Sequence, residues 1–396
     1  GLSIILKNVN KIYKTGDIET YALKNVSLEI KQGEFLVILG PSGRGKSTLL
    51  KSIMGLKAYS GSVKLYGKEI RKMSIREIAQ HIGYVSQNPN DYLSKNSVYE
   101  EVRFTMDNYD IYDQKEGVNN IKTINDMAGI QPVKVDSRII DLIEFAVEGY
   151  EKTGGHVNIA MGPVLKIWHD YRTQGNTDPK NARVPDHADL EEAAKKTDIT
   201  KVVINRNEST VFLAEEGMSL DVGAVAKGYA VELTTDYLVS LGYTSFILSA
   251  GGNVKAVGKP ADGKREKWGI GLQDPDANPY IPEDKIVDTV YITDASVVSS
   301  GDYQRYYTVG DQRYHHLISV ETLMPADWYK VVSVVTEDSG QADFMSSTLF
   351  LVPFEESKRI AEETEMEVMW IFKDGTIKTT PGMKEMLKNI GSATNG

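Results

Sequence analysis

Two groups of residues in this 396-residue chain have the types and spacing that could do chemistry. The first is GPSGRGKST, in which Gly40, Gly45, Lys46 and Ser47 follow the pattern G-x-x-x-x-G-K-S. A strand-like run, EFLVILG, precedes it, and a helical pattern, GKSTLLKSIMG, follows it. In that context glycines let backbone N–H groups surround phosphate oxygens, and the helix N-terminus adds positive potential. The segment therefore predicts a phosphate-binding loop (P-loop), in which Lys46 reaches the β- and γ-phosphates and Ser47 binds magnesium.

The second group lies near the other end of the chain, in the segment QADFMSSTLF. Asp343 and Ser347 are four residues apart, and on a helix this spacing places both oxygens on one face. Magnesium prefers oxygen ligands and often completes its coordination with substrate phosphates. The pair is therefore compatible with a magnesium site, with a helix N-cap or a solvated carboxylate as the alternative for Asp343.

The elements that must position these residues fall into two domains. Short apolar runs alternate with helical patterns over residues 1–105, which is typical of an α/β domain. Near residue 105 the chain becomes polar and is broken by Asn, Asp and Gly, so we place the second domain at 106–396. There we expect a helix at about 137–153, a hairpin around 205–208, a helix after 224, strands in SFILSA, KWGIGLQ and KVVSVVT, and loops at 172–186 and 259–267.

Composition excludes several classes of function. The net charge of −10 disfavours a general nucleic-acid binder, which usually has a basic face. The absence of cysteine excludes disulfides, thiolate metal sites, a cysteine nucleophile and a lipidated N-terminal cysteine. No apolar run reaches the roughly 20 residues of a membrane helix. The N-terminal segment GLSIILKNVNKIYKTG reads as a short strand and not as a secretory signal.

Residues 3–104 resemble the ATPases of ATP-binding cassette (ABC) transporters. Tyr13 lies where that family stacks an aromatic ring on adenine, and Gln87 in YVSQNPN matches its Q-loop. Taken alone, Tyr13 is equally a surface aromatic, and Gln87 carries little information. The resemblance implies ATP as a ligand and a membrane transporter subunit as a partner. The P-loop residues that it implies are Gly40, Gly43, Gly45, Lys46, Ser47 and Thr48.

Two parts that ATP hydrolysis requires are missing from the sequence. These ATPases need an apolar strand that ends in Asp-Glu, in which Asp binds magnesium and Glu polarises water. No run of four apolar residues followed by Asp-Glu occurs downstream of the P-loop, and no LSGGQ signature occurs. The segment LSAGGN at 248–253 has an extra alanine and ends in asparagine, so we assign it to the second domain. The sequence thus predicts a partial ATPase domain that does not hydrolyse ATP.

Residues 107–385 resemble the ApbE-like FAD:protein FMN transferases, which cleave FAD and attach FMN to a Thr or Ser of a target protein. Seven segments carry the resemblance in order: NNIKTINDMAG, TGGHVNIAMGPVLKIWHDYR, MSLDVGAVAKGYA, ILSAGGNV, VVSSGDYQRYY, YHHLISVETLMPA and QADFMSSTLF. The resemblance implies FAD as the FMN donor, magnesium, and a target flavoprotein with a Ser/Thr-Gly-Ala-Thr-like motif. The expected fold class is an α/β P-loop half-domain followed by an α+β ApbE-like flavin transferase domain.

The same resemblance implies roles for individual residues. Asp343, Ser347 and the main-chain carbonyl of Ala224 would bind magnesium. Lys227 would contact FAD and neutralise phosphate charge, and His316 would be the general base for the target hydroxyl, with a structural histidine as the equal alternative. The residues implied to contact FAD are Val157, Asn158, Asp221, Gly223, Lys227, Gly251, Gly252, Asn253, Ser300, Gly301 and His316. Arg305 is interpreted as a phosphate-binding or structural residue.

The chain departs from the family pattern at several places. Ser319 and Val320 stand where Asp and Pro are usual, which removes a carboxylate near the site. Family members begin with a further stretch of strand and helix, where this chain has the half-ATPase, and losing paired strands would expose sheet edges and core. A non-catalytic FAD-binding protein, an FAD pyrophosphatase and an incomplete ABC ATP-binding subunit therefore remain alternatives. Family members usually act outside the cytoplasmic membrane on an anchor or signal that this sequence does not display, so the compartment stays open.

Overall fold

The computed structural model describes residues 2–15, 18–31, 46–54, 57–73, 77–78, 119–276, 286–303 and 305–395. The chain divides into two compact units, residues 1–116 and 117–396, and each is described here by itself. The boundary at residue 105 stays a prediction.

The described residues of the first unit form an antiparallel sheet of order β2-β1-β3-β4 and include the helix α1. The helix α1 contributes Leu49 and Ile53 to a small core with Leu6 and Val63. The elements are β1 (Leu2–Thr15), β2 (Ile18–Lys31), α1 (Lys46–Ile53), β3 (Ser60–Leu65), β4 (Lys68–Glu69) and a 3-10 turn at Ile70–Lys72.

Only part of the predicted nucleotide site falls within this description. Lys46 and Ser47 begin α1, as a P-loop requires, and Thr48 lies in its first turn. Tyr13 lies on β1 with 40% of its surface exposed, and its ring is 5.4 Å from the ammonium group of Lys11. Gly40, Gly43, Gly45 and Gln87 lie outside the described residues. ATP binding by this unit stays a prediction.

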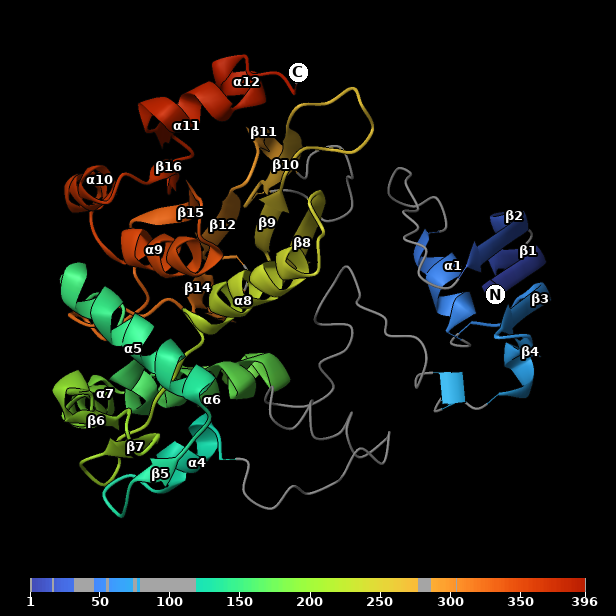
Figure 1. The fold of residues 1–396 in the computed structure, drawn as a ribbon. Coiled ribbons are helices and arrows are strands. Elements are labelled where there is room, and N and C mark those ends of the chain that lie inside the picture. Colours follow the sequence, from blue (N-terminus) through green and yellow to red (C-terminus); the bar gives the residue numbers. More distant parts are fainter. Residues whose placement is uncertain are drawn as a thin grey trace. The chain divides into compact units, whose positions relative to one another are not determined.

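The second unit is built on a six-stranded antiparallel sheet of order β17-β16-β15-β12-β9-β8 (Figure 1). Alternation along the central strands separates its two faces. Val332 and Val334 of β15 pack into the larger core, whereas Val331 and Val335 of the same strand pack into a second core on the opposite face. The strands are β8 (Phe246–Ala250), β9 (Asn253–Val257), β12 (Ser296–Gly301), β15 (Tyr329–Thr336), β16 (Glu367–Phe372) and β17 (Ile377–Thr379).

Two helices that pack against each other, α8 (Ala226–Ser240) and α9 (Ser339–Leu351), cover one face of this sheet (Figure 1). Nearly every residue of α9 is buried, although its sequence SGQADFMSSTLFL is rich in small polar residues. Two of its hydroxyls are paired within the helix, since Ser346 donates to the carbonyl of Asp343 and Thr348 donates to that of Phe344. The buried Oγ of Ser339, by contrast, has no partner among the described residues. Bonds to main-chain carbonyls therefore offset part of the cost of burying this polar helix.

The remaining elements frame this sheet and its helices. The hairpin β10–β11 and the helix α11 pack on the opposite face of the sheet through Leu272, Val290 and Met383. The bounds are α4 (Ile121–Asp126), β5 (Val133–Lys134), α5 (Ser137–Lys152), α6 (Gly162–Thr177), α7 (His187–Ala194), β6 (Val202–Asn205), β7 (Thr210–Leu213), β10 (Trp268–Gln273), β11 (Ile286–Ile292), β13 (Tyr306–Val309), β14 (Gln312–His315), α10 (Phe354–Glu363), α11 (Pro381–Met386) and α12 (Lys388–Gly391), with 3-10 turns at Ile159–Met161, Pro179–Asn181 and Ile199–Lys201.

One predicted loop is wrong in part. Residues 172–177 belong to α6, which continues to Thr177 because the amide of Asp178 still bonds to the carbonyl of Gln174. Gly175 allows this last turn to pack against Tyr307, since a Cβ at that position would overlap the tyrosine ring. The second predicted loop, 259–267, contains no helix or strand.

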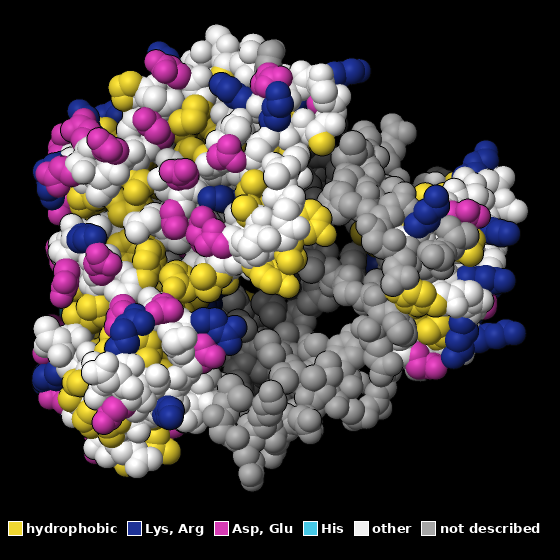
Figure 2. Space-filling model, in the orientation of Figure 1, with side chains coloured by type: hydrophobic (Ala, Val, Ile, Leu, Met, Phe, Trp, Pro, Cys, Tyr) yellow, Lys and Arg dark blue, Asp and Glu magenta, His cyan; other side chains and the backbone are white. Residues whose placement is uncertain are grey.

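The outer side of α8 is unusually apolar for an exposed surface. Leu233, Tyr237 and Leu241 recur every four residues and are each at least 43% exposed. Figure 2 shows hydrophobic side chains gathered over this region. The neighbouring strand β8 forms the edge of the described sheet and exposes Ile247. Within the part of the chain that the structure describes, no helix is both long and apolar enough to cross a membrane.

The close approach of α8 and α9 depends on one glycine and gives a first prediction. A Cβ on Gly228 would overlap the carbonyl oxygen of Ser339 and the Cβ of Asp343. Gly228→Ala should therefore force the helices apart and lower the free energy of unfolding by about 1–3 kcal/mol, measured by urea denaturation. Thr234→Ala, on the exposed side of α8, should change it by less than about 0.5 kcal/mol. Equal stability of the two variants would contradict the packing described here.

Candidate active site

The candidate site centres on Asp343, where α9 crosses the N-terminal turn of α8. The backbone N–H of Gly228 donates to Oδ2 of Asp343 at 2.8 Å, and Nζ of Lys227 lies 3.6 Å from Oδ1. The side chain of Asp343 is only 5% exposed. Burial raises the pKa of this carboxyl, and the nearby charge of Lys227 acts in the opposite direction. The α9 N-cap is Asp338, so the alternative that Asp343 caps a helix is wrong.

Three serine hydroxyls lie on the β12 side of Asp343. Ser300 Oγ of β12 is 2.8 Å from Ser346 Oγ and 3.4 Å from Ser347 Oγ, both on α9. All three side chains are buried. A predicted metal ligand, Ser347, and a predicted flavin contact, Ser300, are thus neighbours, with Gly301 directly after Ser300 at the end of β12.

The oxygen atoms of Asp343, Ser347 and Ala224 are suitable ligands for a hard divalent cation that takes further ligands from a substrate. Asp343 and Ser347 lie one turn apart on α9. The predicted third ligand, Ala224, lies two residues before the first residue of α8, whose N-terminal turn contacts Asp343. The described residues contain no cluster of three His, Cys, Asp or Glu that could bind a metal. One carboxylate, one hydroxyl and one carbonyl leave positions for phosphate oxygens, as in magnesium sites that bind nucleotides.

The segment before α8 is fixed by hydrogen bonds from distant parts of the chain. Asn125 of α4 donates to the carbonyl of Leu220 and accepts from its N–H, at 3.0 and 2.7 Å. The N–H of Asp221 donates to the carbonyl of Ile159 at 2.8 Å. The carboxylate of Asp221 accepts from the N–H of Gly223, which closes the turn that leads into α8. The predicted flavin contacts Asp221 and Gly223 therefore lie in a rigid turn.

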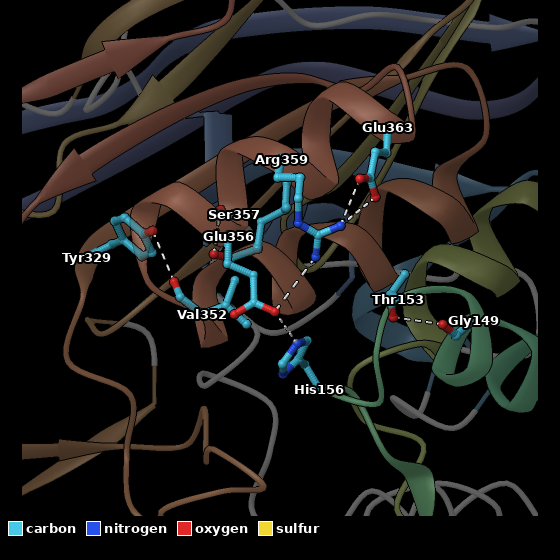
Figure 3. A network of polar contacts seen from close by, with 10 residues as sticks. Gly149, Thr153, His156, Tyr329, Val352, Glu356, Ser357, Arg359 and Glu363 are labelled. Carbon is cyan, nitrogen blue, oxygen red and sulfur yellow. Dashed lines mark hydrogen bonds and ion pairs between the residues drawn. The ribbon is translucent and has the colours of Figure 1, made fainter.

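The segment that contains Val157 and Asn158 lies beside this turn. Val157 is buried in the main core, and Asn158 accepts from the N–H of Ala160 and donates to the carbonyl of Thr197. Nε2 of His156, just before them, lies 3.1 Å from Oε1 of Glu356 on α10. Figure 3 shows these two side chains pointing toward each other. Both predicted flavin residues thus have protein partners, and their contact with a flavin stays a prediction.

The β8–β9 turn approaches Lys227 from the other side. Gly251 and Gly252 have φ values of +56° and +93°, which residues other than glycine rarely adopt. A Cβ on Gly251 would lie 3.6 Å from Cδ of Lys227, so the turn lies against the stem of that lysine. Asn253 follows as the first residue of β9 and is fully buried.

Two consecutive histidines have different environments. His315 is buried, with Nε2 2.7 Å from the carbonyl of Ala326, and its Nδ1 accepts from the N–H of Leu317. Burial lowers the pKa of His315 to about 4. His316 hydrogen-bonds to the backbone of Arg305, whereas its buried Nδ1 has no partner among the described residues. Burial, with the charge of Arg305, lowers the pKa of His316 to about 3. Both ring nitrogens of His315 are thus occupied, whereas Nδ1 of His316 is unpaired within the described part of the chain. The role of His316 as a general base stays a prediction.

Arg172 is a candidate residue that the sequence interpretation missed. Burial lowers the pKa of Arg172, the charge of Arg305 adds to this effect, and the carboxylate of Asp221 opposes it. Arg305 in turn influences the pKa of both His316 and Asp343. The guanidinium of Arg172 also lies 3.0 Å from Nδ1 of His169 on the same helix. Arg172 was overlooked because residues 172–186 were interpreted as a loop, and its role at the site stays a prediction.

The turn after His316 tolerates the unusual Ser319. Its Oγ accepts from the N–H groups of Glu321 and Thr322, at 3.2 and 3.3 Å. A hydroxyl thus supplies the acceptor that a carboxylate would supply in the family pattern. The substitution removes a charge and keeps the turn.

A separate cavity of about 250 Å³ lies on the His315 side of this strand end. Its lining includes Asp302, Arg313, Asp327 and Lys373, and none of the predicted flavin or metal residues. Lys373 pairs with Asp302 at 2.8 Å and with Asp327 at 2.9 Å, so these three charged side chains of the cavity already have partners within the protein. The contacts around Asp343 are therefore better evidence for a site than this cavity.

The buried carboxylate leads to a prediction about pH. Because the folded-state pKa of Asp343 is raised, ionising it costs stability as the pH rises from about 3.9, the unfolded-state pKa, through the folded value. In metal-free protein, the melting temperature of Asp343→Asn should therefore be higher than that of the original protein at pH 7. Below pH 4 the two melting temperatures should become equal. Thermal denaturation in chelator across this range tests it, with Asp236→Asn on exposed α8 as the control. A constant difference between Asp343→Asn and the original protein across the range would contradict the expectation.

Most of the chain is similar to members of one known family. The chain matches the ApbE family over residues 74–371. It is 31% identical over 281 residues to the FAD:protein FMN transferase of Treponema pallidum, an alignment that covers 68% of this chain and 75% of that protein. The solved structure of the ApbE protein of Thermotoga maritima is 27% identical, with a TM-score of 0.59, and the match covers 76% of this chain and 93% of that one.

The first hundred residues are similar to different proteins. They are 48% identical over 101 residues to a Methanosarcina mazei protein named as an ABC transporter ATP-binding protein, which covers 25% of this chain and 17% of that relative. The chain thus spans a small part of such a relative. Since the ApbE match extends over most of the chain and confirms the resemblance seen in the sequence, the chain belongs to the ApbE family.

Proposed function

We propose that this chain is a magnesium-dependent FAD:protein FMN transferase, which moves FMN from FAD to a Thr or Ser of a target flavoprotein and releases AMP. The observation that carries the proposal is the buried carboxylate of Asp343 at the helix crossing, with Lys227 and Ser347 beside it. Relatives named FAD:protein FMN transferase support the same reaction. The target would carry a Ser/Thr-Gly-Ala-Thr-like motif.

In this reaction the target hydroxyl oxygen forms a bond to the phosphorus of the FMN half of FAD. The bond from that phosphorus to the bridging oxygen breaks, and the electron pair leaves with AMP. His316 would take the hydroxyl proton on Nδ1, the ring nitrogen without a partner. A histidine with a pKa of about 3 is a weak base, but a diphosphate beside Arg305 would offset the positive charge that lowers this value.

Asp343, Ser347 and the carbonyl of Ala224 would bind magnesium, which supplies positive charge to the diphosphate when it is bound. Lys227 lies 3.6 Å from Asp343 and would add a second positive charge on the α8 side. Arg305 and Arg172 would contribute charge from the His316 side. Charge neutralisation and positioning are the main requirements of such phosphoryl transfer.

The direct test is incubation of the chain with FAD, magnesium and a target flavoprotein domain. We expect a fluorescent flavin band on the target, release of one AMP per FMN attached, and loss of both with chelator or with Asp343→Ala. Free FMN without labelling would indicate an FAD pyrophosphatase instead. FAD binding without AMP release would indicate a non-catalytic flavin-binding protein.

The role of His316 can be separated from binding. His316→Gln keeps a polar group that can reach the backbone of Arg305 and removes the basic Nδ1. We expect the labelling rate to fall about 10²–10⁴-fold, as for other general bases, with FAD affinity changed only slightly. His315→Gln serves as the comparison, because it should lower stability through the bond to Ala326. Unchanged labelling by His316→Gln would remove His316 from the reaction.

The P-loop gives an independent expectation. The first unit would bind ATP and would not hydrolyse it, because the sequence lacks the Asp-Glu strand and the signature segment. Lys46→Ala should therefore weaken ATP binding and leave flavin transfer unchanged. ATP hydrolysis that depends on Lys46 would instead favour an ABC transporter ATP-binding subunit.

A further inference from the structure

The side chain of Asn253 is the most unusual polar group near the candidate site. The residue is 0% exposed, and neither the oxygen nor the nitrogen of its amide has a hydrogen-bond partner among the described residues. Leaving a buried polar group unpaired destabilises the folded state, and here two polar atoms of one side chain are unpaired. Such groups usually pair with something that the protein does not itself supply.

Strand register shows which way Asn253 faces. Lys255, two residues later on β9, points toward the helices, since its Nζ bonds to Glu232 of α8 and to the carbonyl of Glu337. Side chains two residues apart on a strand lie on the same face, so Asn253 also faces α8 and α9. Val254, between them, packs with the core on the opposite face, as alternation requires.

The same register places Asn253 opposite the part of β12 that contacts the α9 segment. Along β12, Ser296 bonds to the carbonyl of Glu337 and Ser300 bonds to Ser346. These two bonds attach β12 to the residue just before the N-cap of α9 and to the middle of the helix. Asn253 pairs with Val298, midway between Ser296 and Ser300. Its cross-strand partner therefore lies between the two points at which β12 contacts the α9 segment.

Two neighbours connect this amide to the residues already described. Ser300, which contacts Ser347, is the diagonal cross-strand neighbour of Asn253, a position about 7–8 Å away. On the other side, Gly251 in the turn just before Asn253 lies against the stem of Lys227. The unpaired amide is thus enclosed between the serine side and the lysine side of the same site.

We propose that the Asn253 amide is a positioning group for the magnesium diphosphate at Asp343, to which it offers one donor and one acceptor. This inference rests on the proposed function and deepens it. The side chain has no main-chain partner among the described residues that would explain its burial. A neutral amide suits the position for two reasons. A second carboxylate near Asp343 would repel it and destabilise the folded protein when no metal is bound, and a cationic side chain would compete with magnesium.

The test compares Asn253→Leu, which has similar size and no polar atoms, with the original full-length chain. In metal-free protein the variant should melt at the same or a higher temperature, because two unpaired polar atoms are removed. Its affinity for FAD in the presence of magnesium should fall about 10–100-fold, as for other residues that orient a metal site. Thermal denaturation and calorimetric titration measure both without relying on activity.

Two further variants keep the test decisive if Asn253→Leu folds poorly. Asn253→Asp adds a carboxylate, so magnesium alone should raise its melting temperature more than that of the original chain. Ser333→Ala is the matched control on the opposite face of the sheet, where the hydroxyl pairs with Ser299, and it should lower stability without changing FAD affinity.

The outcomes separate the two proposals. If the original chain binds no FAD with magnesium, the proposed function fails, and this inference fails with it. If the original chain binds FAD and labels its target, but Asn253→Leu binds equally well or Asn253→Asp gains nothing from magnesium, only the inference is overturned.

Discussion

The hydrogen bond from the backbone of Gly228 to the carboxylate of Asp343 is the interaction on which the rest of the second unit depends. It exists because α8 and α9 approach so closely that only glycine fits at the contact. The N-terminal turn of α8 supplies the donor, and the partial positive charge of a helix N-terminus favours the buried carboxylate. Since α9 is buried on nearly all sides, the sheet, the second helix and the candidate metal residues are fixed together.

A second buried contact fixes the start of α9 in the same way. Lys255 bonds to Glu232 of α8 and to the carbonyl of Glu337, and the other oxygen of Glu232 accepts from the N–H of Ser339. Buried ion pairs add little net stability, because desolvation offsets their attraction, but breaking one is costly. The contact therefore specifies how α8, β9 and α9 meet. That geometry decides the distance between Asp343 and the residues that would face a diphosphate.

Sequence patterns predicted what depends on local spacing. The helix at about 137–153 is α5, the hairpin around 205–208 joins β6 to β7, and the Asp343–Ser347 spacing indeed lies on a helix. Contacts between segments that are far apart in the sequence could not be predicted from these local patterns. Arg172 lies on α6, which continues beyond the predicted loop boundary, and Gly175 permits that continuation by packing against Tyr307. The unpaired state of the Asn253 amide likewise depends on strand register across two strands, which no single segment encodes.

The two neighbouring histidines show how little freedom the chain has between β14 and the turn that follows. His315 ends the strand with both ring nitrogens occupied, and His316 is the first residue beyond it. Side chains alternate along extended backbone, so inserting or deleting one residue in this stretch would exchange the two environments. His315 would then lie beside Arg305, and His316 would be buried against the carbonyl of Ala326. Although hairpins usually accept insertions and deletions, the segment from the end of β14 to the turn after His316 should not accept them during evolution.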